Sequence, residues 1–348
     1  MRKLSNLLIT GGCGFIGSNF IKILLDENQN ELNIERIINL DKLTYAGDVR
    51  NTRAYNQDSR YKLIEGDICD AALVKDILNE FNIDTIVNFA AESHVDNSIF
   101  NPGEFIDTNI LGTYNLLECS KNYFNKNNEL KFLHVSTDEV YGSLGSDDAP
   151  FNENNKYKPN SPYSASKAAS DHLVRAWNKT YNLSTYITNC SNNYGPNQNK
   201  EKLIPKIISN AFNLKKLPVY GEGLNVRDWL FVDDHCKAII AVLQKGVYGE
   251  TYNIGGLNEI KNIEIVEIIC GLIEESYPIK RNPNLLGSKI NSYADLIEYI
   301  DDRPGHDFRY AIDSKKIEDA LEWYPEETFD SGIRKTVNWY LDQLQGNF

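Results

Sequence analysis

Residues 10–17, Thr-Gly-Gly-Cys-Gly-Phe-Ile-Gly, follow an apolar run and precede a stretch of helical periodicity. Gly11, Gly14 and Gly17 have the spacing of a dinucleotide-binding loop. Such glycines allow a tight turn, close approach to a pyrophosphate and packing of the helix on the strand. The amide groups that begin the helix would then face the phosphates. Glycines at this spacing also occur in plain turns, so the elements around the loop must decide between the two.

Outward from this loop, apolar runs alternate with segments of helical periodicity. The runs are 4–10, 35–41, 61–66, 84–90, 130–136 and 184–190, and helices are expected over 15–29, 70–81, 104–125 and 165–182. This alternation is typical of parallel β–α–β units. We therefore predict an α/β fold: a doubly wound (Rossmann) parallel sheet with a smaller, irregular α/β substrate-binding domain toward the C-terminus.

The acidic residue at the end of the second apolar run indicates which dinucleotide binds. Asp41 would accept hydrogen bonds from the adenosine ribose and repel a 2′-phosphate, which favours NAD over NADP. Lys42 beside it could nevertheless tolerate that phosphate. Asp67, after the third run, could accept from the adenine amino group, and a helix cap is its alternative role.

The alternating pattern loosens after residue 190, where turn-forming residues become frequent. We assign residues 1–190 plus about 228–256 to the NAD-binding domain, because the later segment contains one more helix and strand that could rejoin the sheet. Residues of about 191–227 plus 257–348 are then expected to form the second domain.

Composition excludes several classes of partner. The 348 residues carry a formal net charge of -13, which argues against nucleic acid or an anionic membrane as the partner. The six cysteines lack Cys-x-x-Cys spacing and no apolar leader opens the chain, so we expect reduced thiols and a cytoplasmic location. No apolar run is long enough to cross a membrane. The spacing of the five histidines predicts no metal site.

Tyr163 and Lys167 lie four residues apart near the start of an expected helix, and therefore on one helix face. An ammonium group next to a phenol lowers the pKa of the phenol, so Tyr163 could act as a base near neutral pH. The alternative is a solvated surface pair. The catalytic interpretation is favoured by the glycine loop upstream and by the Ser-Thr pair that ends the fifth apolar run.

Two adjacent carboxylic acids, Asp138 and Glu139, come directly after Ser136 and Thr137. Neighbours on a regular strand point to opposite faces, so both could reach one ligand only if the strand ends or bends at Asp138. Adjacent carboxyls in a closed site shift their pKa values apart, so that one can act as a base while the other stays an acid. Two exposed carboxylates at a strand end are the alternative.

The chain resembles the extended short-chain dehydrogenase/reductase family of nucleotide-sugar enzymes. The resemblance covers nearly the whole chain and lies in the segments TGGCGFIGS, NFAAESHVDNSI, STDEVYG, SPYSASK, SNNYGP, EKLIP, YGEGLNVRDWLFVDDH, NIGG and DRPGHD. The triplet at 137–139 is similar to the branch of hydro-lyases that dehydrate dTDP-glucose to dTDP-4-keto-6-deoxy-glucose. An NAD-dependent 4-epimerase or decarboxylase of another nucleotide sugar is the alternative.

This resemblance implies a role for each residue of the catalytic set. Tyr163 would take the O4 proton while NAD⁺ takes the C4 hydride, with Thr137 hydrogen-bonded to O4. Glu139 would then remove the acidified C5 proton and Asp138 would protonate the departing C6 hydroxyl. Return of the hydride to C6 would regenerate NAD⁺.

The resemblance also implies contacts for each ligand. Expected NAD contacts are Gly11, Gly14, Phe15, Ile16, Gly17, Asp41, Asp67, Ile68, Ala90, Ala91, Ser93, Tyr163 and Lys167. Expected nucleotide-sugar contacts are Ser93, Thr137, Asn192, Lys202, Leu203, Tyr220, Arg227, Asn258, Arg303 and His306. Among these, Arg227 is expected to clamp the diphosphate, because a guanidinium matches phosphate oxygens bidentately. Tyr220 is expected to stack on the base, with core packing as its alternative role.

Assembly and two other functions complete the hypotheses. The resemblance implies a homodimer through the helices at about 104–125 and 165–182, whose apolar stripes could instead pack on their own sheet. These stripes are Leu111, Tyr114, Leu117 and Leu173, Val174, Trp177. A cofactor-bound sensor without turnover would have little use for the full catalytic set. A simple alcohol dehydrogenase would need no acid–base pair beyond the tyrosine.

Overall fold

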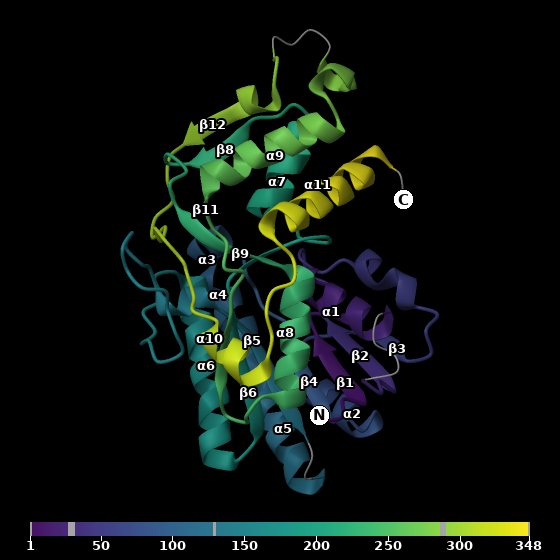
Figure 1. The fold of residues 1–348 in the computed structure, drawn as a ribbon. Coiled ribbons are helices and arrows are strands. Elements are labelled where there is room, and N and C mark those ends of the chain that lie inside the picture. The colour runs from purple at the N-terminus through teal and green to yellow at the C-terminus, as the bar shows by residue number, and fades with distance from the viewer. Residues whose placement is uncertain (1, 27–31, 128–129, 286–289, 347–348) are drawn as a thin grey trace.

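The computed structural model describes residues 2–26, 32–127, 130–285 and 290–346 (Figure 1). Its largest element is a parallel sheet of seven strands in the order β10-β6-β5-β4-β1-β2-β3. The strands are β1 (Asn6–Thr10), β2 (Arg36–Asp41), β3 (Tyr61–Glu65), β4 (Thr85–Asn88), β5 (Lys131–Thr137), β6 (Ser184–Cys190) and β10 (Thr251–Ile254). The predicted doubly wound fold is confirmed. Because the strand order reverses between β1 and β4, a crevice is expected at their carboxyl ends.

Helices cover both faces of this sheet. One face carries α1 (Phe15–Asp26) and α8 (Val232–Lys245), and the other carries α2 (Ala71–Glu80), α5 (Thr113–Asn127) and α6 (Pro162–Tyr181). Residues 27–29 of the expected first helix lie outside the described residues. The helix expected from 104 is a continuous run of α4 (Pro102–Phe105), a π-helical stretch η2 (Ile106–Gly112) and α5.

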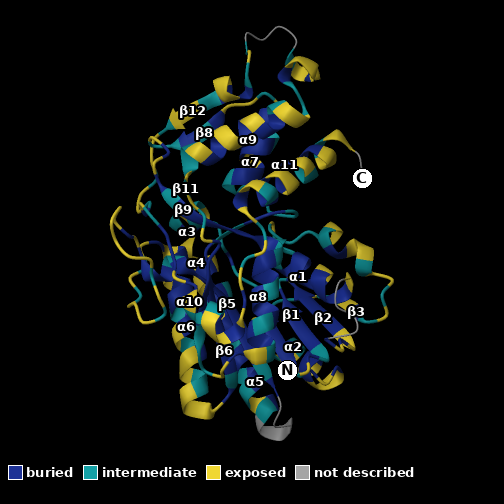
Figure 2. Ribbon diagram, in the orientation of Figure 1, coloured by how far each residue is buried: buried dark blue, intermediate teal, exposed yellow. Residues whose placement is uncertain are grey.

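The central strand β1 shows why the sheet is stable between two helical layers. Leu7 and Ile9 enter the apolar cluster under α1 and α8, whereas Leu8 enters the cluster under α2, α5 and α6. Alternate residues of a strand point to opposite faces, so a strand buried on both sides must be apolar throughout. Figure 2 shows the resulting buried centre, with exposed residues on the outer faces of the helices and on the surrounding loops.

A second domain, at the top of Figure 1, has its own apolar cluster. It contains a sheet in the order β11-β9-β7 and a two-stranded sheet of β12 and β8. Its strands are β7 (Asn192–Tyr194), β8 (Leu217–Tyr220), β9 (Val226–Phe231), β11 (Glu259–Lys261) and β12 (Ile297–Ile300). Its helices are α7 (Leu203–Phe212), α9 (Asn262–Ser276) and α11 (Phe329–Gln345).

Two segments differ from the expected domain division. Strand β9 pairs with β7 and β11 and not with the large sheet, so within 228–256 it is α8 and β10 that rejoin the first domain. Helix α10 (Lys315–Leu321) packs on the first domain, so the expectation that it belongs to the second domain is wrong. Ile317, Leu321 and Trp323 pack in the first domain's cluster beneath α8, where they cover apolar surface next to the sheet edge.

Candidate active site

A cleft of about 290 Å³ lies at the carboxyl ends of the central strands, where the strand order reverses. It brings together all of the expected NAD contacts and all five expected catalytic residues. The lining includes Gly11, Gly14, Phe15, Ile16, Gly17, Asp41, Asp67, Ile68, Ala90, Ala91, Ser93, Thr137, Asp138, Glu139, Tyr163 and Lys167. Segments from four separate crossovers therefore meet at one edge of the sheet.

The glycine loop leaves no room for side chains at the points where the backbone must close on itself. Gly11 has φ +69°, and a Cβ there would lie 2.8 Å from the backbone of Ala90. A Cβ on Gly17 would lie 2.5 Å from the carbonyl oxygen of Gly11. The loop therefore keeps α1 pressed against the end of β1 and presents bare backbone to the cleft, as a pyrophosphate requires.

Asp41 is held in the orientation that a ribose diol needs. Its two carboxylate oxygens accept from the backbone amides of Cys13 and Leu43, each at 2.8 Å. Burial raises the pKa of this carboxyl, and the two amides oppose that shift. Each oxygen can accept a further hydrogen bond, and Asp41 is part of the cleft lining. The residues present therefore fit an adenosine ribose.

Lys42 does not stand free beside Asp41. Its Nζ forms an ion pair with Asp67 Oδ2 at 2.7 Å, so the charge that could have accepted a 2′-phosphate already has a partner. Asp67 Oδ1 accepts from the amide of Cys69, while helix α2 is capped by Asp70. The alternative role of Asp67 as the helix cap is therefore wrong.

Strand β5 ends at Thr137, and this ending places both neighbouring carboxyls in the cleft. Residues Asp138–Tyr141 form a short 3₁₀ helix, η3, whose N-cap is Thr137. The amide of Glu139 donates to Thr137 Oγ1 at 3.3 Å. Because the chain turns at Asp138, the alternation of a regular strand no longer applies, and Asp138 and Glu139 both line the cleft.

The two carboxyls have unlike surroundings. Asp138 is 2% exposed, and its Oδ2 has no hydrogen-bond partner. Burial, then the charges of Glu139 and Asp228, raise the pKa of Asp138 well above its ordinary value. Burial also raises the pKa of Glu139, but Arg303, Lys202 and Arg227 oppose the shift. Asp138 therefore favours the neutral acid, while Glu139 has cations nearby to support its charged form.

Tyr163 lies in the first turn of α6, which begins at Pro162 after the N-cap Ser161. Burial, then the charge of Glu139, raise the pKa of the phenol well above its ordinary value, while a hydrogen bond with Thr137 lowers it. Lys167 Nζ instead donates to the carbonyl of Val135 at 2.8 Å. Burial therefore dominates the pKa of the phenol in this arrangement, and the lowering expected from Lys167 stays a prediction.

Expected substrate contacts fall into two groups. Ser93, Thr137, Asn192 and Lys202 line the cleft, and Lys202 Nζ donates to the carbonyl of Ser93 at 2.8 Å. Leu203 follows Lys202 as the first residue of α7. The others do not line this cleft and lie in the second domain: Tyr220, Arg227, Asn258, Arg303 and His306.

The side chains of Arg227 and Asn258 donate their hydrogen bonds to backbone carbonyls. Arg227 donates to the carbonyls of Val226 (2.7 Å), Asp307 (2.8 Å) and Phe308 (3.2 Å), with its guanidinium 4.2 Å from the Tyr310 ring. Asn258 Nδ2 donates to the carbonyls of Gly256 and Trp229. Arg227 thus ties the DRPGHD loop to β9, and its role at a diphosphate stays a prediction.

Asp96, in α3 (Val95–Phe100), connects the two domains and was not singled out from the sequence. It accepts from the Tyr220 hydroxyl at 3.1 Å and from Arg303 Nη1 at 2.8 Å. His306 packs edge-on to the Tyr220 ring at 6.0 Å and contacts Asp302 Oδ1 at 2.6 Å. The segment NFAAESHVDNSI pointed to this region, but the partners of Asp96 lie more than 120 residues away along the chain.

Three remaining features concern His94, metal binding and membrane spans. His94 accepts from the amide of Asn97 as the N-cap of α3, a structural contact. Within the described ranges, no group of three or more His, Cys, Asp or Glu side chains is arranged to hold a metal. No helix of the described chain combines the length and the apolar character that a membrane span needs.

Comparison with known proteins gives a consistent picture. A family model described as GDP-mannose 4,6 dehydratase matches residues 8–336. The chain is 51% identical to a dTDP-glucose 4,6-dehydratase of Neisseria meningitidis, covering 98% of this chain and 94% of the relative. It is 50% identical to dTDP-glucose 4,6-dehydratase 1 of Escherichia coli, covering 97% and 93%.

Solved structures resemble it over the same length. The dTDP-glucose 4,6-dehydratase of Bacillus anthracis in complex with NAD has a TM-score of 0.84 at 44% identity, covering 98% of both chains. The Streptomyces venezuelae enzyme of the same name, also solved with NAD bound, has a TM-score of 0.87 at 42% identity and 98% coverage of both. A UDP-glucose 4-epimerase of Thermotoga maritima, with a TM-score of 0.81 over 97% of this chain and 99% of its own, is 24% identical and shares the fold alone.

Proposed function

The chain belongs to the dTDP-glucose 4,6-dehydratase family of extended short-chain dehydrogenase/reductases, and we propose that it converts dTDP-glucose to dTDP-4-keto-6-deoxy-glucose as an NAD-dependent hydro-lyase. One observation carries the proposal. The acid pair Asp138 and Glu139 lines the same cleft as Tyr163, Lys167 and the glycine loop, with the chain turned at Asp138 so that both carboxyls reach it.

The first step is oxidation at C4. Tyr163 accepts the proton of O4, and the Thr137 hydroxyl, which already reaches the phenol, orients that oxygen. NAD⁺, when bound, would supply the hydride acceptor at C4 and later the hydride donor at C6. The Gly11–Gly17 loop would hold its pyrophosphate and Asp41 its ribose diol, and Lys167 lines the same cleft as Tyr163.

Elimination follows because the C4 carbonyl acidifies the hydrogen on C5. Glu139 removes that proton, since the cations near it stabilise the carboxylate. Asp138 donates a proton to the departing C6 hydroxyl, since its surroundings keep it neutral. The hydroxide thus leaves as water.

Substrate residues outside the cleft remain part of the proposal. Lys202 and Asn192 line the cleft, which supports their assignment to the sugar or its diphosphate. Arg303, Arg227 and His306 lie on the second domain, where Arg303 and Arg227 are close enough to Glu139 to lower its pKa. Lys202 in the cleft, together with these cations of the second domain, is suited to a ligand with two phosphates.

Product analysis tests the proposal. Purified chain incubated with dTDP-glucose should form a 4-keto-6-deoxy sugar, seen by the absorbance of the alkali-treated product, and deuterium placed at C4 should appear at C6. UDP-glucose and CDP-glucose serve as matched substrates of different base. An inverted C4 hydroxyl without loss of water would indicate a 4-epimerase, release of carbon dioxide from a uronic acid would indicate a decarboxylase, and net NADH would indicate a simple dehydrogenase.

We also propose that the chain forms a homodimer through η2, α5 and α6. Leu111 and Ile106 of η2 and Tyr114 of α5 are about half exposed, and Phe100, at the end of the preceding helix α3, is 85% exposed. Large exposed apolar side chains on neighbouring elements are suited to an interface. Of the expected stripes, Leu117 and Val174 are buried in their own domain and do not contribute.

All six cysteines are free, which supports the proposal of a cytoplasmic location.

A further inference from the structure

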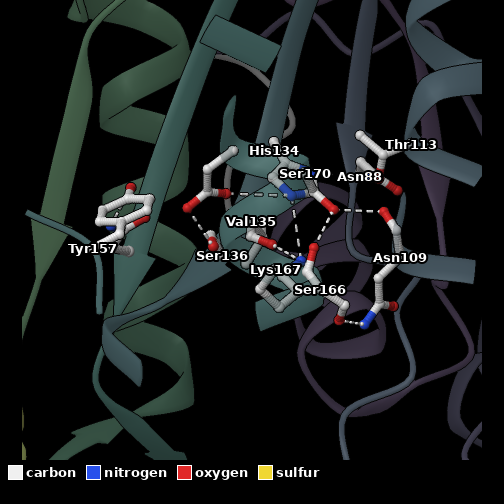
Figure 3. Close-up of polar contacts among 12 residues, drawn as sticks. Asn88, Asn109, Thr113, His134, Val135, Ser136, Tyr157, Ser166, Lys167 and Ser170 are labelled. Carbon is white, nitrogen blue, oxygen red and sulfur yellow. Dashed lines mark hydrogen bonds and ion pairs between the residues drawn. The ribbon is translucent and has the colours of Figure 1, made fainter. Parts of the chain in front are cut away.

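Lys167 is surrounded by a buried polar network that the proposed mechanism does not use (Figure 3). The side chain is 3% exposed, and its Nζ lies 2.8 Å from the Val135 carbonyl and 3.3 Å from His134 Nε2. On the other side of the ring, His134 Nδ1 contacts Asn88 Nδ2 at 3.1 Å. The backbone and imidazole of β5 thus fix the direction of the ammonium group.

Asp171 supplies the negative charge of this network. It lies one turn after Lys167 on α6 and is 2% exposed. Its Oδ2 accepts from the Ser136 hydroxyl at 2.9 Å, while its Oδ1 lies 3.6 Å from His134 Nε2 and has no hydrogen bond. A carboxylate this deeply buried is costly unless a cation accompanies it.

The electrostatics of the pair are reciprocal. Burial lowers the pKa of Lys167 to about 8, and Asp171 is the largest influence that raises it. Burial raises the pKa of Asp171 to about 7, and Lys167 is the largest influence that lowers it. Each residue therefore shifts the pKa of the other toward its charged form, against the effect of burial.

We propose that Asp171 and His134 are positioning residues for Lys167: the carboxylate favours the charged form of the buried ammonium, and the imidazole, with the Val135 carbonyl, holds it at the wall of the cleft that Lys167 lines. This inference rests on the proposed function and deepens it. Neither residue lines the cleft, so we expect neither to touch a ligand.

The groups facing this pair come from several elements. Lys167 faces His134 and the Val135 carbonyl on β5, Asp171 on its own helix and Cys190 on β6. Asp171 also accepts from the Ser136 hydroxyl on β5 and faces the hydroxyl of Tyr157, and both neighbours lower its pKa. Burial and the charge of Lys167 keep the pKa of His134 well below its ordinary value, so the imidazole stays neutral.

Asp171→Asn tests the proposal in a nearly unchanged shape. We measure the affinity for NAD⁺ by calorimetry without sugar, and kcat/KM for dTDP-glucose, both across pH. Without its counterion Lys167 loses its proton at lower pH, so the alkaline limb of both profiles should move down by roughly 1 to 3 pH units. His134→Gln should weaken NAD⁺ binding with a smaller shift, because the charge partner remains.

Ser170→Ala is the matched control, since Ser170 is adjacent, buried and uncharged and donates to the carbonyls of Asn109 and Ser166. Ser170→Ala should lower the melting temperature and leave the alkaline limb of both pH profiles at the wild-type pH. An unshifted limb in Asp171→Asn, or an equal shift in Ser170→Ala, would overturn the proposal.

If Asp171→Asn does not fold, Ser136→Ala tests the role of Asp171 instead, because it removes the hydroxyl donor that favours the charged form of the Asp171 carboxylate. The acid limb of NAD⁺ binding should then move to higher pH, and an unmoved limb would refute the role of Asp171. Because NAD⁺ binding needs no sugar, a wild-type chain without dehydratase turnover would sink the proposed function and leave this inference standing.

Discussion

The backbone amide of Glu139 donates a hydrogen bond to the side-chain oxygen of Thr137 at 3.3 Å, and β5 ends at this contact. The capped turn brings two consecutive carboxyls to one side of the chain, which a continuing strand would have separated. Acid and base can therefore act on adjacent carbons of one ligand. The proposed elimination depends on this turn as much as on the carboxyls themselves.

Removing either carboxyl should separate oxidation from elimination. Asp138→Asn and Glu139→Gln should each lower kcat for dehydration by roughly 10²- to 10⁴-fold, the usual contribution of a general acid or base. Hydride transfer from C4 needs neither group, so reduced nicotinamide should accumulate transiently in both variants and be visible by stopped-flow absorbance. Dehydration at the wild-type rate in both variants would refute the assignment.

Stability should depend on pH through Asp138. Its pKa is raised well above 3.8 in the fold, so the folded state binds this proton more tightly than the unfolded chain. Stability from this group is complete at low pH and is lost as pH rises from 3.8 through the raised value. Asp138→Asn should therefore stabilise the protein at neutral pH by roughly 1 to 3 kcal/mol. Melting curves at several pH values should show a gain that grows with pH, and a constant or negative difference would contradict the burial argument.

Glycine substitutions should distinguish the cofactor loop from ordinary helix. Gly17→Ala puts a methyl group 2.5 Å from the Gly11 carbonyl oxygen, so α1 must shift and NAD⁺ affinity should fall at least about tenfold. Gly271→Ala is the control, because in α9 nothing lies within 4 Å of the added carbon. It should leave NAD⁺ binding unchanged and stabilise the helix by up to about 1 kcal/mol. Calorimetric titration and thermal melts measure both, and equal NAD⁺ affinity of Gly17→Ala and wild type would be the contrary result.

The contact of Asp96 with the second domain should govern substrate affinity. Asp96→Asn weakens the charge-assisted bond to Arg303 and should raise KM for dTDP-glucose by roughly 5- to 20-fold, with a smaller change in kcat. Tyr220→Phe removes the other hydrogen bond and keeps the ring, so its effect on KM should be smaller. Steady-state kinetics measure the changes in KM and kcat separately. A fall in kcat at constant KM would place Asp96 in the chemistry instead.

The proposed homodimer can be disrupted at its most exposed apolar positions. Leu111→Arg combined with Phe100→Arg should yield monomers in sedimentation velocity experiments at concentrations where the wild type is dimeric, because the charges would be buried unpaired. Leu257→Arg is the control, since Leu257 is 60% exposed but lies outside these helices. A wild-type chain that sediments as a monomer would sink the proposal.

Local patterns in the sequence were sufficient for the sheet and for the glycine loop at the end of its first strand, because strand alternation and glycine spacing are short-range properties of the chain. The full catalytic set was predicted from the family resemblance, and the structure brings its residues into one cleft. Strand β6 matches its expected bounds of 184–190, and Asp41 ends β2 as expected. The π-helical stretch η2 inside the long helix, the return of α10 to the first core and the pairing of β9 outside the large sheet had no such local signal.

Tertiary packing decided how deeply the predicted catalytic residues are buried and which charges lie near them. Whether a phenol or a carboxyl is buried, and which charges face it, depends on segments that are distant in the sequence, so neither the raised pKa of Tyr163 nor the unlike surroundings of Asp138 and Glu139 could be derived from spacing. The partnership of Lys167 with Asp171 and His134 has the same origin. Desolvation is a property of the assembled core, and a linear sequence supplies the groups without the dielectric in which they act.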